Sequence, residues 1–245
     1  MLLGMRYLSG LLLLFLCGCS ATWVAPLDFV NVNIQTEKYE IATWQRTTNL
    51  SDPIHIYIEG DGRAFDGRGQ PTRNPTPRGH LVRNFVSNDP AANVAYIARP
   101  CQYVMSETCS VSDWTSGRFS VDIIESTAHA IKKIAKDRPV ILIGYSGGAL
   151  LSGLIIQKYP EINIKKWITI AGVLNHSDWT KHFGDEPLST SQDLNTLPNI
   201  SQTHYVAEHD KTVPYELSSR WTGGKNLVVV PGATHDDFGD WNPEL

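Results

Sequence analysis

Several features that would point away from a single globular domain are scarce in this sequence of 245 residues. Basic residues are in no excess, because 21 Lys and Arg stand against 25 Asp and Glu for a formal net charge of −4. The surplus of positive charge that drives nucleic-acid binding is therefore missing. No segment recurs at a fixed period, and 19 Gly and 14 Pro are too few for a low-complexity chain. The 42% of hydrophobic residues are enough for the core of one ordinary α/β or all-β domain.

Apolar runs of membrane-spanning length are also missing. The run at residues 11–16 is too short for a spanning helix, which needs about 20 apolar residues. It follows the single charge of Arg6 and ends in small residues, which is the pattern of a secretory signal. Leu16-Cys17-Gly18-Cys19 resembles the bacterial lipoprotein box, in which a signal peptidase cuts before an acylated cysteine.

We therefore expect residues 1–18 to be a lipoprotein signal peptide, Cys19 to carry the lipid, and residues 19–27 to form a tether to the membrane. Ser20 after the lipidated cysteine resembles the outer-membrane sorting signal of a diderm bacterium. The expected location is the cell envelope, at the periplasmic face of the outer membrane. The alternative is an ordinary cleaved secretory signal with incidental cysteines.

Only two cysteines follow this segment, Cys101 and Cys109. An even pair in an oxidising compartment favours a disulfide, and closing so short a loop stabilises the fold by about 2–3 kcal/mol in the chain-entropy model. The neighbouring Gln, Tyr, Ser and Thr side chains are poor zinc ligands, so we expect a structural disulfide and no metal.

The hydrophobic pattern of the rest of the chain predicts an α/β domain over residues 28–245. Alternating apolar and polar residues at 29–34 and 39–44 indicate an antiparallel hairpin. Further strands are expected at 54–59, 94–97, 140–143, 167–171, 204–207 and 227–230, and helices at 78–88, 120–136, 147–159 and 214–221. Because strands and helices alternate, we expect a mostly parallel central sheet with an N-terminal antiparallel hairpin and helices on both faces. Residues 174–201 are expected to form a small lid.

A sharp turn between a strand and a helix is predicted at Ser146. Gly144-Tyr145-Ser146-Gly147-Gly148 has the pattern G-x-S-x-G directly after the apolar run 140–143. Such a turn forces the serine into strained backbone angles, so its neighbours must be nearly free of side chain. The strain exposes the hydroxyl at the carboxyl edge of the sheet, where open α/β sheets build their sites. Ser146 is therefore the candidate nucleophile, and the alternative is a mere tight turn.

A serine hydroxyl needs a base to take its proton and an acid to orient that base. His235 follows the last expected strand, and Asp210 follows the strand before it, which fits the chain order of Ser, acid and His. Glu208, Asp236 and Asp237 remain alternative acids. His176, His182 and His209 lie in or near the expected site and could line it, and another histidine in place of His235 remains an alternative base.

Acyl transfer also needs two N–H donors directed at the oxyanion. The backbone N–H of Gly147 is one candidate, and the loop after residues 54–59 supplies the other. Asp61 is the first choice by position and Gly62 the second, although a plain glycine turn is equally compatible with the local sequence. Arg63, Tyr145 and His176 are expected to contact the substrate.

These motifs together resemble the α/β-hydrolase superfamily, and in particular uncharacterised bacterial α/β-hydrolase lipoproteins. The resemblance covers residues from about 50 to 240 and rests on the segments 57–62, 98–103 and 144–148. It implies the α/β-hydrolase fold and a catalytic triad of Ser146, Asp210 and His235. The sequence departs from it at Glu59, where the superfamily often has histidine before the oxyanion glycine.

The expected activity is that of a membrane-anchored serine hydrolase that cleaves carboxylic esters, with thioesters and lipid acyl esters as further candidates. No cofactor is expected. The partners are a small-molecule or lipid ester and the membrane, and the oligomeric state stays open. Two alternatives remain, namely an amidase or peptidase with the same triad and a non-catalytic envelope binding protein.

Arginines are concentrated in the loop after Gly60. They are Arg63, Arg68, Arg73 and Arg78, and Arg99 and Arg118 lie on either side of the cysteine loop. Arginine suits bidentate capture of phosphate or carboxylate, so one interpretation is a substrate with an anionic group. The alternative is that these arginines pair with Asp61, Asp66 and other acids to hold a long loop in place.

Overall fold

The computed structural model describes residues 25–245. Its centre is one eight-stranded sheet with the strand order β1-β2-β4-β3-β5-β6-β7-β8. The strands are β1 (Val30–Gln35), β2 (Glu40–Thr47), β3 (Ile54–Ile58), β4 (Asn93–Ile97), β5 (Val140–Tyr145), β6 (Ile164–Ile170), β7 (Ser201–Ala207) and β8 (Leu227–Val230). β1 pairs with β2, and β2 with β4, in antiparallel register, whereas all other pairs are parallel. The expected fold class is confirmed.

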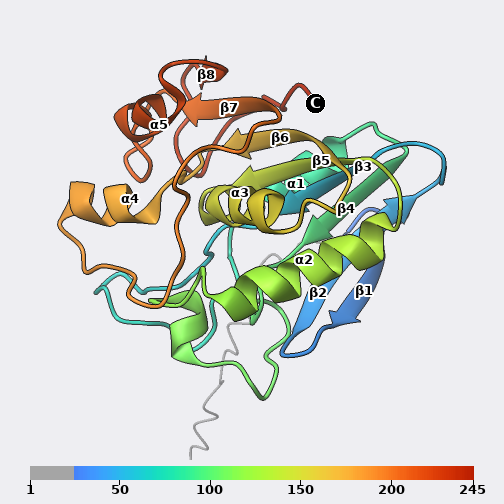
Figure 1. Ribbon diagram of the computed structural model, residues 1–245, viewed down its shortest axis with the longest axis horizontal. Coiled ribbons are helices and arrows are strands. Elements are labelled where there is room, and N and C mark those ends of the chain that lie inside the picture. Colours follow the sequence, from blue (N-terminus) through green and yellow to red (C-terminus); the bar gives the residue numbers. More distant parts are fainter. Residues whose placement is uncertain (1–24) are drawn as a thin grey trace, which may run out of the picture.

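Helices cover both faces of this sheet (Figure 1). They are α1 (Leu81–Asn88), α2 (Val121–Ala135), α3 (Gly147–Lys158), α4 (His176–Phe183) and α5 (Tyr215–Thr222), together with the 3₁₀ helix η1 (Val111–Trp114). One hydrophobic core joins α2 and α3 to the sheet through side chains such as Ile131 and Leu150. The other joins α1 and the C-terminal segment to the opposite face through Phe85, Phe238 and Trp241.

The central strands are apolar on both faces because both are covered. Every residue of β4 is buried, and so are four of the six residues of β5. The hairpin strand β1 lies at one edge, and only Ile34 of its six residues is buried, whereas Val30 and Val32 are exposed. The continuous apolar runs of the central strands thus follow from their place in the sheet, whereas the alternation in β1 is not matched by alternating burial.

The expected lid, residues 174–201, consists of α4 and irregular segments that precede β7, and its opening or closing stays a prediction. The expected signal peptide, the lipidated Cys19 and most of the tether 19–27 lie outside the described residues. Among residues 25–245, no helix has the length and hydropathy needed to cross a membrane.

Candidate active site

Ser146 occupies the turn between β5 and α3, with φ 50° and ψ −121°. Glycine is required on both sides of it, because added side chains would strike backbone that cannot move aside. A Cβ at Gly144 would lie 2.4 Å from the carbonyl oxygen of Gly148, and one at Gly148 would lie 2.5 Å from that of Ile58. The serine is therefore held in the left-handed region by a close-packed crossing of strand and helix.

Three side chains from three strand ends meet at this turn. His235, in the segment after β8, has its Nε2 3.1 Å from the Ser146 Oγ. Its Nδ1 lies 2.8 Å from Oδ2 of Asp210, which follows β7. The Asp210 side chain is fully buried, and its Oδ1 accepts hydrogen bonds from the backbone N–H groups of Thr212 and Val213, each 2.8 Å long. This chain of contacts has the geometry of a Ser-His-Asp triad.

The alternative acids have other partners. Glu208 accepts the backbone N–H of Gly232 and lies 3.7 Å from His209. Asp237 accepts the backbone N–H of Gly239. Asp210 is the carboxylate that contacts the His235 imidazole within the described part of the chain.

Tyr145 lies beside His235, with 5.3 Å between the ring centroids. Its hydroxyl is within hydrogen-bond distance of the His235 carbonyl oxygen, at 3.0 Å, and of Asp236 Oδ1, at 3.1 Å. The phenol thus helps to hold the loop that carries His235. Tyr145 also lines the cavity described below, and its expected contact with substrate stays a prediction.

The loop after β3 passes against Ser146, since a Cβ at Gly60 would lie 3.1 Å from the Ser146 Cβ. The Gly60 N–H already donates to Glu59 Oε1, and the Arg63 N–H donates to the Pro75 carbonyl oxygen. In residues 25–245, the N–H groups of Asp61, Gly62 and Gly147 have no acceptor. They are the groups in this region that are left to bind an oxyanion.

Asp61 and Gly62 face different neighbours. The Asp61 carboxylate lies against Gly147, where an added Cβ would meet its Oδ1 at 2.1 Å. Gly62 faces Pro75, whose carbonyl oxygen would lie 2.1 Å from an added Cβ. The structure therefore brings Asp61, the first choice by position, next to Gly147.

Two guanidinium groups hold the Asp61 carboxylate. Arg99 Nη1 donates to Oδ1 at 2.9 Å, and Arg118 Nη1 donates to Oδ2 at 2.6 Å. Burial by itself raises the pKa of Asp61, but the two adjacent positive charges outweigh it and hold that pKa below its ordinary value. The charge of Asp61, which would oppose an oxyanion beside Gly147, is thus more than balanced. Pairing of the arginines with Asp61, the alternative given from the sequence, is what the structure shows for Arg99 and Arg118.

Glu59 is the other carboxyl group behind this loop, and it is buried. Its oxygens accept the Gly60 N–H at 2.8 Å and the Tyr96 hydroxyl at 2.8 Å. Burial raises the pKa of Glu59. At the position where the superfamily often has histidine, this chain therefore has a carboxyl group that fixes the peptide before Asp61.

A cavity of about 550 Å³ opens onto Ser146 and His235. Both remaining expected substrate contacts, Arg63 and His176, line it. His176 is stacked on Phe119 with 5.8 Å between ring centroids, and neither ring nitrogen has a hydrogen-bond partner. Burial lowers the pKa of His176, and the Asp193 carboxylate, 3.6 Å from Nε2, opposes this shift. Within residues 25–245, no cluster of three or more His, Cys, Asp or Glu side chains suits a metal ion.

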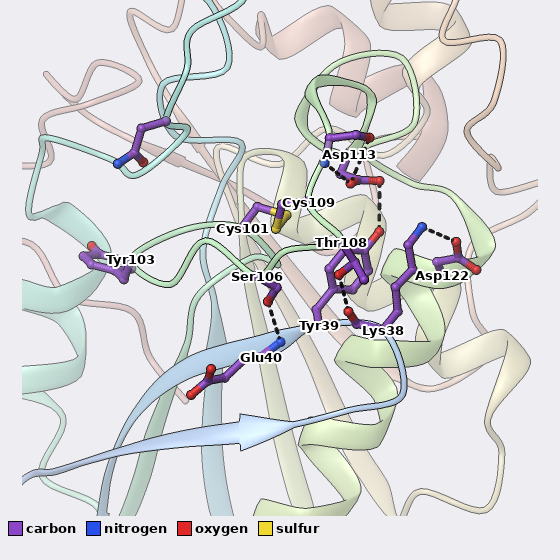
Figure 2. Close-up of a disulfide and its surroundings, with 12 residues drawn as sticks. Lys38, Tyr39, Glu40, Cys101, Tyr103, Ser106, Thr108, Cys109, Asp113 and Asp122 are labelled. Atoms are coloured by element: carbon purple, nitrogen blue, oxygen red, sulfur yellow. Dashed lines mark hydrogen bonds and ion pairs between the residues drawn. A yellow bond between two sulfur atoms is a disulfide. The ribbon is translucent and has the colours of Figure 1, made fainter.

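A disulfide joins Cys101 to Cys109 (Figure 2). The loop that it closes is tied to the start of β2, because the Glu40 N–H donates to the Ser106 hydroxyl at 2.9 Å. At the other side of the bridge, Gln102 Nε2 donates to the Gly60 carbonyl oxygen at 3.0 Å. The cysteine loop thus supports the segment that carries Asp61.

Comparisons with known proteins place this geometry in a known fold. No family model and no curated protein sequence matches the chain. Among solved structures, an α/β serine hydrolase without a lid from Xanthomonas campestris is similar with a TM-score of 0.53 and 12% identity, over 87% of this chain and 88% of that one. Est1E from Butyrivibrio proteoclasticus has a TM-score of 0.56 and 16% identity, over 84% and 90% of the two chains. A thioesterase domain from the curacin biosynthetic pathway has a TM-score of 0.54 and 14% identity, over 85% and 94%.

These likenesses show that the chain has the α/β-hydrolase fold. The resemblance found from the sequence is thereby confirmed at the level of the fold.

Proposed function

We propose that the protein is a serine hydrolase that cleaves carboxylic esters. The observation that carries this proposal is the continuous set of contacts from Asp210 through His235 to the Ser146 hydroxyl. The cavity above these groups gives a substrate access to them. The structural neighbours described as serine hydrolases and as a thioesterase support the same chemistry.

The proposed reaction begins when the Ser146 Oγ bonds to the ester carbonyl carbon and its proton passes to His235 Nε2. The carbonyl oxygen becomes negatively charged, and the N–H groups of Gly147 and Asp61 stabilise it. His235 then gives the proton to the leaving alkoxide, which departs as an alcohol. Water attacks the acyl-enzyme with His235 as base, and the acid and free Ser146 are released.

Asp210 keeps His235 in the tautomer that this sequence of steps needs. Its Oδ2 accepts the Nδ1 proton, so the lone pair of Nε2 faces Ser146. The two backbone N–H groups that bind Oδ1 fix the carboxylate itself.

The test uses a fluorophosphonate probe and a 4-nitrophenyl ester of a short fatty acid with the folded protein. We expect the probe to label Ser146 and the ester to be hydrolysed, and Ser146→Ala to lose both properties while its Tm is retained. Hydrolysis of a 4-nitroanilide at a comparable kcat/KM would favour the amidase alternative. Folded protein that neither reacts with the probe nor turns over an ester would favour the binding protein.

We further propose that the mature chain begins at a lipid-bearing Cys19 and works at the membrane surface of the cell envelope. The lipoprotein box at residues 16–19 supports this. The tether of residues 20–27 reaches at most ~30 Å, so the domain stays near the bilayer. Cys19→Ser should move the protein from the membrane to the soluble fraction, or leave its signal uncleaved, and an unchanged distribution would contradict the anchor.

A further inference from the structure

Three guanidinium groups line the cavity beside Ser146. Arg63 and Arg78 come from the long loop between β3 and α1, and Arg118 comes from the segment before α2. Neither the Arg63 nor the Arg78 side chain forms a hydrogen bond or an ion pair with any residue in 25–245. Their charges are therefore available to something that enters the cavity.

The carboxylates expected to neutralise the loop arginines have other partners. Asp61 is held by Arg99 and Arg118. The Asp66 Oδ1 accepts the backbone N–H groups of Arg68 and Gln70. Among the described residues, neither Arg63 nor Arg78 forms an ion pair with these acids. The charge of Arg63 acts on Asp66 only from a distance, and it is the smallest of the influences on the pKa of Asp66.

Three carboxyl groups also line the cavity, namely Glu59, Asp61 and Asp236. Burial raises the pKa of Glu59, which favours its neutral form. Asp236 accepts a hydrogen bond from the Tyr145 hydroxyl. Asp61 shares its single charge between two guanidinium groups. Arg118 is paired with Asp61. Of the other charged groups that line the cavity, Arg63 and Arg78 are positive and Asp236 is negative.

Arg118 presents its charge inside the cavity wall. Its side chain is 8% exposed and lies 5.8 Å from the Phe65 ring and 5.9 Å from the Trp179 ring. Nη1 donates to Asp61 and Nε donates to the Thr115 carbonyl oxygen. Its Nη2 has no acceptor among the described residues, so a donor remains for a ligand.

Apolar side chains make up much of the rest of the wall, among them Phe119, Val173 and Leu188. A cavity with an apolar wall and several cations fits a molecule that has both an alkyl part and an anionic group. Arginine is suited to such a group, because its planar guanidinium binds carboxylate or phosphate with two parallel hydrogen bonds.

We propose that the cavity selects esters that carry a carboxylate or phosphate group near the ester bond, with Arg63, Arg78 and Arg118 as the anion site. This substrate class rests on the proposed hydrolase function. The anion belongs either to the acyl part or to the alcohol part of the substrate, and the test separates the two.

The test compares kcat/KM for pairs of esters that differ only in charge. For the alcohol part the pair is 4-carboxyphenyl butyrate and 4-carbamoylphenyl butyrate, and for the acyl part it is the mono-4-nitrophenyl esters of glutarate and glutaramate. We expect the wild type to prefer the anionic member of at least one pair. In the double variant Arg63→Gln, Arg78→Gln, the ratio of kcat/KM for that pair should fall by about tenfold at low salt, the effect of losing charge-assisted hydrogen bonds in a partly exposed site. The same ratio in the wild type should fall as salt is raised.

The chain offers a matched control in Arg68→Gln, Arg73→Gln. These arginines belong to the same loop and are exposed, the double variant loses the same net charge, and neither residue lines the cavity. We expect its ratio to equal that of the wild type. An equal fall in both double variants would show a long-range charge effect and overturn the anion site.

Failure of this proposal differs from failure of the proposed function. A wild type that hydrolyses neutral esters as well as anionic ones overturns the anion site alone. If no ester is cleaved, binding decides instead, through calorimetric titration of the Ser146→Ala protein with hexyl phosphate and with hexanol. Equal or absent binding of both would overturn the anion site, and selective binding of the phosphate that Arg63→Gln, Arg78→Gln removes would support it.

Discussion

Replacing Gly147 by alanine tests the oxyanion side of the proposed site. A Cβ at this position would lie 2.1 Å from Asp61 Oδ1, 2.7 Å from its Cγ and 3.0 Å from its Oδ2. Ordinary van der Waals contact begins at 3.4 Å, so Oδ1 has to retreat by about 3.4 − 2.1 = 1.3 Å. The retreat is opposed because Arg99 and Arg118 hold both oxygens.

The N–H groups of Asp61 and Gly147 therefore move apart in Gly147→Ala. Misplacement of a catalytic group by about 1 Å costs about 10²-fold in rate, and loss of one oxyanion donor costs about 10²–10³-fold in kcat. We expect kcat for a 4-nitrophenyl ester to fall within that range, with a smaller change in KM. The rate of fluorophosphonate labelling should fall in parallel.

Two controls make the interpretation specific. Gly67→Ala adds a methyl group with no atom within 4 Å and should leave kcat unchanged. In an Asp61→Ala background the three closest atoms are gone, so adding Gly147→Ala should cost less than about tenfold. A Gly147→Ala protein with kcat within a few-fold of the wild type would refute the placement of the oxyanion donors.

Two further predictions follow from single side chains. Asp210→Asn should lower kcat by on the order of 10⁴-fold with little loss of stability, because the two backbone N–H groups at Oδ1 keep the amide oxygen there and turn the NH₂ group toward His235. Steady-state kinetics and a retained Tm check this, and a full rate would exclude Asp210 as the acid. Burial lowers the pKa of His204 to about 4. Between about pH 6.5 and pH 4, the His204 side chain is therefore protonated in the unfolded state and not in the folded state. The free energy of unfolding falls over this range on acidification, by at most about 3 kcal/mol. Urea unfolding at pH 7 and pH 4.5 should show a smaller loss for His204→Asn than for the wild type, and equal losses would contradict the assignment.

The strands and helices were predictable from the sequence wherever one physical pattern dominated. The expected helix at 120–136 differs from α2 by one residue at each end, since its apolar residues recur on one face and that face meets the sheet. The strand at 227–230 coincides with β8. Ser146, Asp210 and His235 were placed together because each follows a strand and parallel strands end at the same edge.

The surroundings of the loop after β3, which carries Asp61 and is called the oxyanion loop below, were not predictable in the same way. Arg99 and Arg118 lie 38 and 57 residues from Asp61, and nothing in local periodicity links them. The arginines of the loop after β3 are of the same residue type as Arg99 and Arg118. Only the packing of the folded chain decides which of the arginines reach a carboxylate. The local charge of the loop was compatible both with an anion site and with pairing to acids, and it did not show which guanidinium groups line the cavity.

The support of the proposed site is divided between two parts of the chain. Ser146, Asp210 and His235 follow the ends of β5, β7 and β8, so the sheet fixes their positions. The oxyanion loop follows β3 and is not itself part of the sheet. Side chains from residues 99–118 hold it in place, namely those of Arg99, Gln102 and Arg118. The disulfide closes the middle of this segment. The sheet edge that positions the proposed triad therefore depends on a separate, cross-linked segment to complete the proposed oxyanion site, and two of the side chains that reach the loop after β3, those of Arg99 and Gln102, lie within two residues of Cys101.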